Sequence, residues 1–153
     1  MSARPDSVWR IAPMRTDELD AVTAIENAAY PFPWTRGNFA DSMATGYRCE
    51  VATVGGELVA YSVLMLALDE SHLLNLTVSG AWQRRGYGRG MLLHLMDAAR
   101  TAGTRRMFLE VRPSNDAGRA LYAANGFLQI AVRRAYYPAE GGREDALLLA
   151  RDL

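Results

Sequence analysis

The chain has 153 residues, of which 50% are hydrophobic and 22% are charged, and this size and composition fit one compact globular domain spanning residues 1–153. Its 17 basic and 17 acidic side chains give a formal net charge of zero. No overall field therefore attracts nucleic acid or an anionic membrane, and we expect neither as a direct partner.

The few cysteines and histidines also restrict the possibilities. The single cysteine, Cys49, excludes an intramolecular disulfide and fits a reducing compartment, where it is expected to be a core or strand residue. His72 and His94 lack a metal-ligand pattern, so no metal is expected. The segment Met1–Arg10 lacks the apolar core of a signal peptide, and no run is apolar enough to span a membrane. We therefore expect a cytoplasmic protein.

The first half of the chain predicts a strand, two helices and a hairpin of two strands. The predicted ranges are Val8–Met14, Thr16–Ala29, Thr35–Met43, Tyr47–Val54 and Leu58–Leu68. The first helix has an apolar stripe at Leu19, Val22, Ile25 and Ala29. Because these positions recur at three or four residues, this face of the helix should pack against a core.

The second half continues with alternating strands and helices. The predicted strands are Ser71–Val78, Arg106–Val111, Phe127–Tyr137 and Asp145–Leu153, the predicted helices are Gly88–Thr101 and Ser114 or Asn115 to Ala124, and Pro138–Gly142 is expected to be a loop. The buried face of the first of these helices should comprise Met91, Leu92, Leu95, Met96 and Ala99. The resulting order, β-α-α-β-β-β-α-β-α-β-β, predicts an α/β (α+β) fold with helices crossing a mixed sheet.

The run Gln83–Gly90, QRRGYGRG, lies between a predicted strand and a predicted helix. A strand that enters a helix through a glycine-rich turn presents free backbone N–H groups at the helix N-terminus, where the helix dipole favours anions. The run therefore predicts a phosphate-binding turn. Its spacing fits neither a P-loop nor a dinucleotide-binding turn, so a nucleotide-hydrolysing protein is disfavoured. An ordinary glycine turn before a helix remains an alternative.

A second set of motifs follows this turn. It consists of Leu109–Asn115 (LEVRPSN), Ala120–Tyr122 (ALY) and Asn125–Phe127 (NGF). Together with the Q-x-x-G-x-G turn, these motifs resemble the core of the GCN5-related N-acetyltransferase (GNAT) superfamily. The resemblance implies a GNAT-type fold, with a central mixed, mostly antiparallel sheet of about six to seven strands flanked by about four helices. It also implies acetyl-CoA as co-substrate.

Within that superfamily, the chain resembles the RimI type over nearly its whole length. The matching runs are Phe32–Thr35 (FPWT), Arg133–Tyr137 (RRAYY) and Arg143–Ala146 (REDA). Enzymes of this type acetylate the N-terminal alanine of small-subunit ribosomal protein eighteen, so the resemblance implies a ribosomal-protein acceptor. The acetyl group would move directly from acetyl-CoA to the alanine amine in a ternary complex.

The resemblance assigns two catalytic residues. Glu110 would be the general base, because a carboxylate can remove a proton from an α-amino group whose reference pKa is near 8. Tyr122 would be the general acid, donating a proton to the departing thiolate from a phenol that stays protonated at neutral pH. The alternatives are that Glu110 faces solvent or pairs with Arg112, and that the hydroxyl of Tyr122 lies in water.

The resemblance also assigns the contacts to the co-substrate. Backbone groups of Leu76, Thr77 and Val78 would pair with the pantetheine arm as an added strand. The pyrophosphate would lie at Arg84, Arg85, Gly86, Tyr87, Gly88 and Arg89, with the arginines adding charge to the backbone amides. Asn115 would bind the amide arm, although an N-cap role explains this residue equally well. Where many members have an acidic residue and proline, this chain has Ser79–Gly80, which is expected to loosen the turn.

The acceptor site is less evident from the sequence. Two prolines in Tyr30–Trp34 end the first helix and leave an aromatic loop, which with Tyr136 and Tyr137 could form the walls of a peptide groove. Core packing is the alternative for these aromatic residues.

Two other functions remain open, namely a GNAT acetyltransferase for another protein or small-molecule amine, and a non-catalytic acyl-CoA-binding module.

Overall fold

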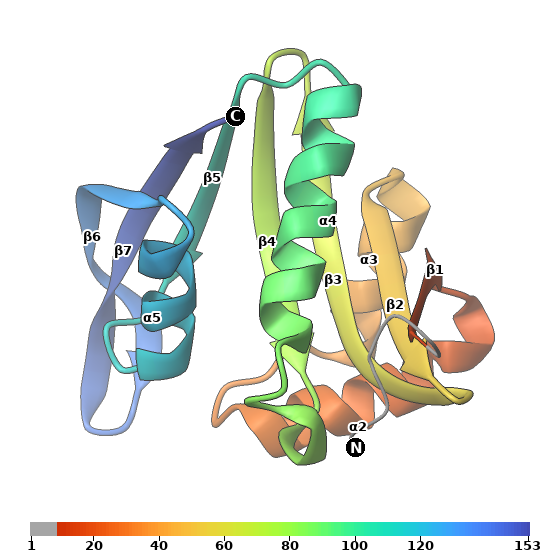
Figure 1. Ribbon diagram of the computed structural model, residues 1–153. Coiled ribbons are helices and arrows are strands. Elements are labelled where there is room, and N and C mark those ends of the chain that lie inside the picture. Colours follow the sequence, from red (N-terminus) through yellow and green to blue (C-terminus); the bar gives the residue numbers. More distant parts are fainter. Residues whose placement is uncertain (1–8) are drawn as a thin grey trace. The chain divides into compact units, whose positions relative to one another are not determined.

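The computed structural model describes residues 9–153, and within them it contains seven strands and four α-helices. The elements are β1 (Trp9–Pro13), η1 (Thr16–Glu18), α2 (Leu19–Ala29), α3 (Arg36–Thr45), β2 (Arg48–Val54), β3 (Glu57–Ala67), β4 (Glu70–Val78), η2 (Gly80–Trp82), α4 (Tyr87–Thr101), β5 (Arg106–Val111), α5 (Asp116–Ala124), β6 (Leu128–Ala139) and β7 (Gly142–Asp152) (Figure 1). The sheet order is β1-β2-β3-β4-β5-β7-β6. The predicted fold class and element order are confirmed, whereas Val8 and the preceding residues lie outside the described residues.

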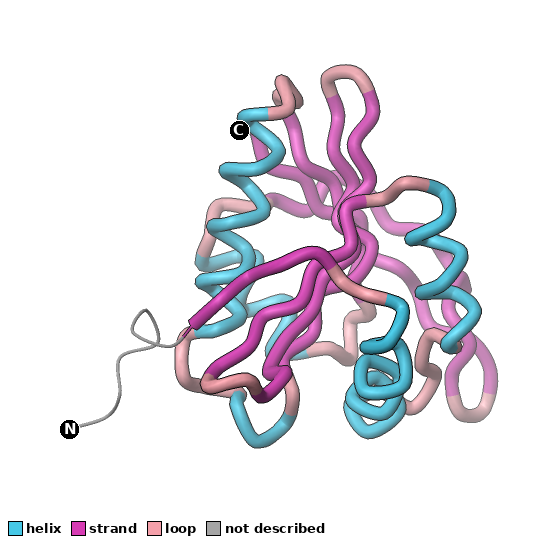
Figure 2. Tube along the Cα trace, turned by 90° about the vertical axis from the view of Figure 1, so that its right-hand side faces the viewer, coloured by secondary structure: helices cyan, strands magenta, loops and turns pink. Residues whose placement is uncertain are grey.

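The described residues form two compact units, and each is described by itself. The first comprises the chain up to Leu64 together with Asn75–Leu95. In this unit β1 pairs antiparallel with β2, and β2 pairs antiparallel with β3; Figure 2 draws the strands in magenta and the helices in cyan. Its core includes Phe39 of α3, whose ring meets that of Tyr61 edge to face with centroids 5.5 Å apart.

Helix α2 begins later than the sequence predicts. Residues Thr16–Glu18 form a tight 3-10 turn, in which the backbone N–H of Arg15 donates to Glu18 Oε1 at 2.9 Å, and the α-helix starts at Leu19. Along the predicted stripe Leu19 and Val22 are buried and Ile25 packs against them, but Ala29 is exposed. The position one turn after Val22 is taken by Glu26, a buried carboxylate that the apolar pattern did not reveal.

Helix α3 starts as predicted, because Thr35 is its N-cap. The Thr35 hydroxyl accepts from the backbone N–H of Asn38 at 3.1 Å, and Asn38 Oδ1 accepts from the backbone N–H of Thr35 at 2.9 Å. This reciprocal pair satisfies two amides that the helix itself leaves free. The helix ends at Gly46, whose φ of 92° is a left-handed conformation that glycine adopts at low cost.

The second unit comprises Met65–Leu74 and Met96–Leu153. The first residues of β4 pair in parallel with β5, with Glu70–Leu73 opposite Arg106–Leu109. Strand β7 pairs antiparallel with β5 on one side and with β6 on the other, so the closing hairpin forms the end of the sheet.

The loop predicted at Pro138–Gly142 is shorter than expected, because only Glu140 and Gly141 form the turn, and the predicted start of the last strand at Asp145 is wrong. Strand β6 continues to Ala139 and β7 begins at Gly142, and these two residues are paired. Gly141, with φ of 77°, allows the tight reversal. Pro138 can lie within β6 because β6 is an edge strand, where a residue without a backbone N–H group need not break the ladder of hydrogen bonds.

Two further expectations about burial are confirmed. All five residues predicted for the inner face of α4 are buried. Cys49 is a buried residue of β2, and burial raises the pKa of its thiol to about 11.

We expect Phe39→Ala to lower the free energy of unfolding by about 3–5 kcal/mol, because it removes a fully buried ring from between Tyr61 and Trp34. Urea denaturation followed by circular dichroism would measure the change. Leu68→Ala is the control, since Leu68 is 98% exposed and its replacement should change the unfolding free energy by less than about 0.5 kcal/mol. Similar losses in the two variants would contradict this description of the core.

Candidate active site

In the first unit, the turn between β4 and α4 is held by hydrogen bonds. The backbone N–H of Ser79 donates to the carbonyl of Val59 at 2.8 Å, and the residues that follow form the 3-10 turn η2. The side chain of Gln83 donates from Nε2 to the carbonyl of Val78, the last residue of β4, at 3.1 Å. The side chain of Gln83 thus connects the turn to the last residue of β4.

The turn then enters α4 with a backbone conformation suited to binding an anion. Arg84 and Gly86 both have positive φ, 64° and 89°, and α4 begins at Tyr87. The first helical bond of the turn runs from the backbone N–H of Gly90 to the carbonyl of Gly86 at 2.9 Å. The N–H groups of the preceding helical residues therefore have no partner within the helix, and they lie at the positive end of its dipole. This geometry fits a pyrophosphate.

The turn has exposed, charged side chains and one buried aromatic side chain. The guanidinium groups belong to exposed residues, Arg84, Arg85 and Arg89. Tyr87 is buried instead, with its ring stacked on Trp9 at a centroid distance of 4.9 Å and edge-on to Trp82 at 5.7 Å. The Tyr87 side chain consequently anchors the start of the helix, which leaves its backbone N–H as the group that can serve a ligand.

The part of β4 predicted to bind pantetheine has a polar network on its side chains. The Thr77 hydroxyl donates to Asn75 Oδ1 at 2.8 Å and lies 2.8 Å from the Tyr30 hydroxyl, while Asn75 Nδ2 donates to Glu26 Oε1 at 3.2 Å. Sequence reasoning missed Asn75 and Glu26. The available signal was an acid at helical spacing from Leu19 and Val22, where an apolar residue is expected.

Glu110 lies in the second unit, on β5. Its neighbours Leu109 and Val111 are buried on one face of the strand, and Glu110 points to the other face, where its side chain is 27% exposed. Its Oε2 atom is nevertheless buried, and the described residues supply that atom with no hydrogen bond. The Nε atom of Arg133 lies 3.4 Å away, within ion-pair distance but outside hydrogen-bond geometry. A buried carboxylate oxygen in this state is able to accept a proton from a ligand.

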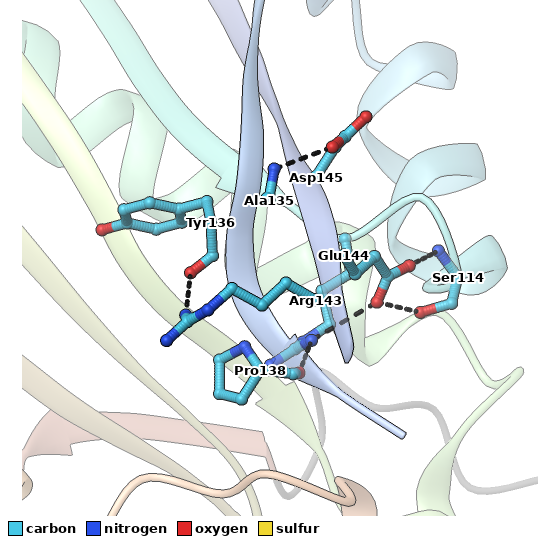
Figure 3. A network of polar contacts seen from close by, with 8 residues as sticks. Ser114, Ala135, Tyr136, Pro138, Arg143, Glu144 and Asp145 are labelled. Atoms are coloured by element: carbon cyan, nitrogen blue, oxygen red, sulfur yellow. Dashed lines mark hydrogen bonds and ion pairs between the residues drawn. The ribbon is translucent and has the colours of Figure 1, made fainter. Parts of the chain in front are cut away.

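A carboxylate of the closing strand, Glu144, organises the end of β5. Glu144 accepts from the backbone N–H and the hydroxyl of Ser114 at 2.8 and 3.0 Å (Figure 3). It also accepts from Nη1 of Arg112 at 3.3 Å. The hydrogen bonds from Ser114, followed by Arg112, lower the pKa of Glu144 below its ordinary value. The network joins the turn before α5 to β7, so Arg112 is paired with Glu144, and the ion pair of Glu110 is with Arg133.

Tyr122 and Asn115 lie at opposite ends of α5. Tyr122 is 8% exposed, and its ring meets that of Phe127 with centroids 5.7 Å apart, so its side chain is packed within the unit. Asn115 is the N-cap of the helix, because its Oδ1 accepts from the backbone N–H of Gly118 at 3.0 Å. The alternative N-cap role of Asn115 is therefore confirmed.

The two tyrosines near the end of β6 are packed against arginines. The guanidinium of Arg112 lies 4.3 Å from the centroid of the Tyr137 ring, and that of Arg133 lies 4.5 Å from the Tyr136 ring. Burial, followed by the negative charge of Glu110, raises the pKa of Tyr137 to about 12, so its hydroxyl stays protonated at neutral pH. Tyr136 is exposed, as a residue available to a peptide would be.

Residues 9–153 show neither a cluster of metal ligands nor a membrane-spanning helix. They contain no group of three or more histidine, cysteine or acidic side chains arranged to hold a metal ion. Over the same residues, no helix is long and apolar enough to cross a membrane.

Comparison with known proteins agrees with this geometry. A model of the acetyltransferase (GNAT) family matches residues 19–127. The chain is 39% identical over 140 residues to the [ribosomal protein bS18]-alanine N-acetyltransferase of Escherichia coli K12, covering 92% of this chain and 95% of that protein. The chain therefore belongs to the GNAT family of acetyltransferases, whose acetyl donor is acetyl-CoA.

Solved structures show the same fold. The crystal structure of the Escherichia coli ribosomal-protein-S18-alanine N-acetyltransferase superposes with a TM-score of 0.87 at 38% identity, covering 94% of this chain and 93% of the other. A Salmonella typhimurium structure containing its cofactor acetyl-CoA has a TM-score of 0.77 at 21% identity, with 95% and 94% of the two chains covered. The first resembles this chain in sequence and fold, and the second shows the fold alone.

We expect the Glu144 network to make stability depend on acidic pH. Its pKa is lower in the folded protein, so its contribution is present above the ordinary carboxyl value of 4.5 and is lost as the pH falls through the lowered folded value. The unfolding free energy of the unsubstituted protein should thus fall more steeply below pH 4.5 than that of Glu144→Gln. Denaturant titrations at pH 7, 5, 4 and 3 would measure both slopes, and parallel slopes would contradict the assignment.

Two substitutions of Asn115 distinguish capping from ligand binding. Asn115→Ala removes the cap and should lower the unfolding free energy by about 1 kcal/mol, whereas Asn115→Asp keeps an oxygen for the Gly118 amide and should preserve stability. If the carboxamide N–H₂ also binds acetyl-CoA, the aspartate variant should show weaker binding in calorimetry at unchanged stability. Unchanged affinity in Asn115→Asp would leave this residue with capping alone.

Proposed function

We propose that this protein acetylates the N-terminal alanine amine of small-subunit ribosomal protein eighteen, with acetyl-CoA as donor. The acceptor is inferred from the relative at 39% identity, which is a [ribosomal protein bS18]-alanine N-acetyltransferase and which aligns over 95% of its own length. The observation in this chain that carries the chemistry is the buried Oε2 atom of Glu110, which the described residues leave without a hydrogen bond.

The proposed reaction needs two proton transfers. Glu110 takes a proton from the alanine amine as the nitrogen forms a bond to the acetyl carbonyl carbon. Tyr122 donates its phenolic proton to the sulfur as the carbon–sulfur bond breaks. The thioester of acetyl-CoA supplies the activated acetyl group, and no covalent bond to the protein forms. Arg133 would hold the Glu110 carboxylate in place before the amine arrives, since its guanidinium is 3.4 Å away.

The binding of acetyl-CoA is proposed to use the turn and strand of the first unit. The amides that start α4, including those of Tyr87, Gly88 and Arg89, would receive the pyrophosphate. The exposed guanidinium groups of Arg84 and Arg85 would add charge. Backbone groups of Leu76–Val78 would pair with the pantetheine arm. What supports this assignment is the left-handed backbone at Arg84 and Gly86, a conformation that occurs in anion-binding turns.

We further propose that residues 1–153 act as one domain. Both β4 and α4 contribute residues to each of the two units, and the family match at residues 19–127 extends over parts of both. The acceptor would be met in the cytoplasm, where ribosomal proteins are made. A GNAT enzyme for another amine and a non-catalytic acyl-CoA-binding module are the alternatives that the following experiment separates.

The test is mass spectrometry of a peptide copying the alanine-starting N-terminus of small-subunit ribosomal protein eighteen, after incubation with the protein and acetyl-CoA. One acetyl group should be added to this peptide and none to a lysine-containing peptide with a blocked N-terminus. Glu110→Gln and Tyr122→Phe should each lower kcat by about 100- to 10,000-fold, the usual contribution of a general base or acid. Calorimetry should show that both variants still bind acetyl-CoA.

Each alternative predicts a different result. Acetylation of the lysine peptide alone would reassign the acceptor but keep the enzyme class. Binding of acetyl-CoA without acetylation of any amine offered would favour the non-catalytic module. Wild-type turnover by both variants would remove the roles assigned to Glu110 and Tyr122. Glu140→Gln is a control, since Glu140 is an exposed residue in the turn between β6 and β7 and should keep full activity.

A further inference from the structure

Glu26 is a buried carboxylate whose two oxygens are both occupied. The residue is 2% exposed on α2. Oε1 accepts from the Tyr61 hydroxyl at 2.7 Å and from Asn75 Nδ2 at 3.2 Å, while Oε2 accepts from the backbone N–H of Trp34 at 3.0 Å. Every one of these partners is a donor. Burying a carboxyl group costs free energy unless hydrogen-bond donors surround it, so the buried position of Glu26 depends on these three donors.

The donor and the acceptor of each hydrogen bond between Tyr30 and Glu26 can be assigned. The Thr77 hydroxyl has a single proton, which it donates to Asn75 Oδ1, and the Tyr30 hydroxyl 2.8 Å from Thr77 Oγ1 must therefore be a donor. This leaves the Asn75 amide with its oxygen toward Thr77 and its nitrogen toward Glu26. Burial raises the pKa of Tyr30, so its hydroxyl keeps the proton that the chain of bonds requires.

These bonds connect two segments that carry different parts of the proposed site. One is the aromatic loop, tied through the backbone N–H of Trp34 and through the hydroxyl of Tyr30. The other is the end of β4, tied through Asn75 and Thr77. Within this loop Phe32 is exposed, whereas Trp34 packs against the core of the unit. The loop is thus fastened on both sides of an exposed aromatic ring.

We propose that Glu26 is a positioning residue that holds the Tyr30–Trp34 loop against Asn75–Thr77 and thereby sets the affinity for the acceptor peptide. This inference rests on the proposed function, together with the expectation from the sequence that the aromatic loop forms a wall of the acceptor groove. A glutamine at position 26 has only one acceptor oxygen, and its N–H₂ group must therefore face a donor that the carboxylate of Glu26 accepts from. The single oxygen is expected to face the two donors Tyr61 and Asn75, so the N–H₂ group faces the Trp34 amide. The Trp34 amide then loses its acceptor, and this end of the loop is released from Glu26 while the backbone of Leu76–Val78 remains in its strand.

The first measurement is backbone hydrogen exchange, which needs no substrate. In Glu26→Gln the Trp34 amide should exchange at least about tenfold faster than in the unsubstituted protein, the change expected for loss of one hydrogen bond to a charged group. Amides in the middle of β2 should be unaffected. Asp20→Asn is the matched control, because it makes the same chemical change at an exposed position of the same helix and should leave the Trp34 amide protected.

The second measurement separates positioning from a purely structural role. Glu26→Gln and Tyr30→Phe should each raise the KM for the alanine peptide about tenfold, while the Kd for acetyl-CoA stays within about twofold of the unsubstituted value. Asp20→Asn should leave both unchanged. A protein that is merely less stable would show a lower melting temperature with normal KM in its folded fraction.

The outcomes distinguish this proposal from the proposed function. Failure of the unsubstituted protein to acetylate the alanine peptide overturns the function, and the exchange measurement still tests the position of the loop. Unchanged Trp34 exchange in a folded Glu26→Gln protein overturns the inference, as does a normal peptide KM. If Glu26→Gln does not fold, the peptide KM of Tyr30→Phe tests the inference, since this substitution removes one hydroxyl and keeps the ring. A normal peptide KM in that variant also overturns the inference.

Discussion

The conformation of the turn at Arg84–Gly86 is the constraint on which the proposed use of the first unit depends. Two positive φ angles within three residues reverse the chain after β4 and start α4 with its first amides unpaired. Gln83 fixes the turn to the last carbonyl of β4, and the buried ring of Tyr87 fixes the first residue of the helix. Both contacts keep the unpaired amides in one orientation, which is what an anion at a helix N-terminus requires.

Three carboxylates show how the same group acquires different roles from its surroundings. Glu26 has both oxygens bonded to donors and is buried, so it holds two segments together. Glu144 receives a backbone amide, a hydroxyl and a guanidinium, and these partners lower its pKa and stabilise the turn before α5. Glu110 alone among the three has a buried oxygen without a hydrogen bond in the described chain, and this is the observation on which its proposed role as a base rests.

Local patterns in the sequence were sufficient for most of the fold. Periodicity identified the buried face of α4, Thr35 marked the start of α3, and the strand boundaries of β5 were predicted to the residue. The errors occurred where distant contacts override local preference. Pro138 and two glycines indicate a five-residue loop by themselves, yet pairing of β6 with β7 leaves only Glu140 and Gly141 as the turn, because an edge strand tolerates proline.

The sequence by itself determined the family, the element order and the candidates Glu110 and Tyr122, because motif spacing and hydrophobic periodicity are properties of neighbouring residues. Only the tertiary structure showed that Glu26 is buried beside Tyr61 and Asn75, residues 35 and 49 positions away, and that Arg133 faces Glu110. Hydrogen bonds of this kind depend on which strands and helices become neighbours. The spacing of Glu26 from Leu19 and Val22 can mark it as facing the core, but it cannot identify the three donors that surround it.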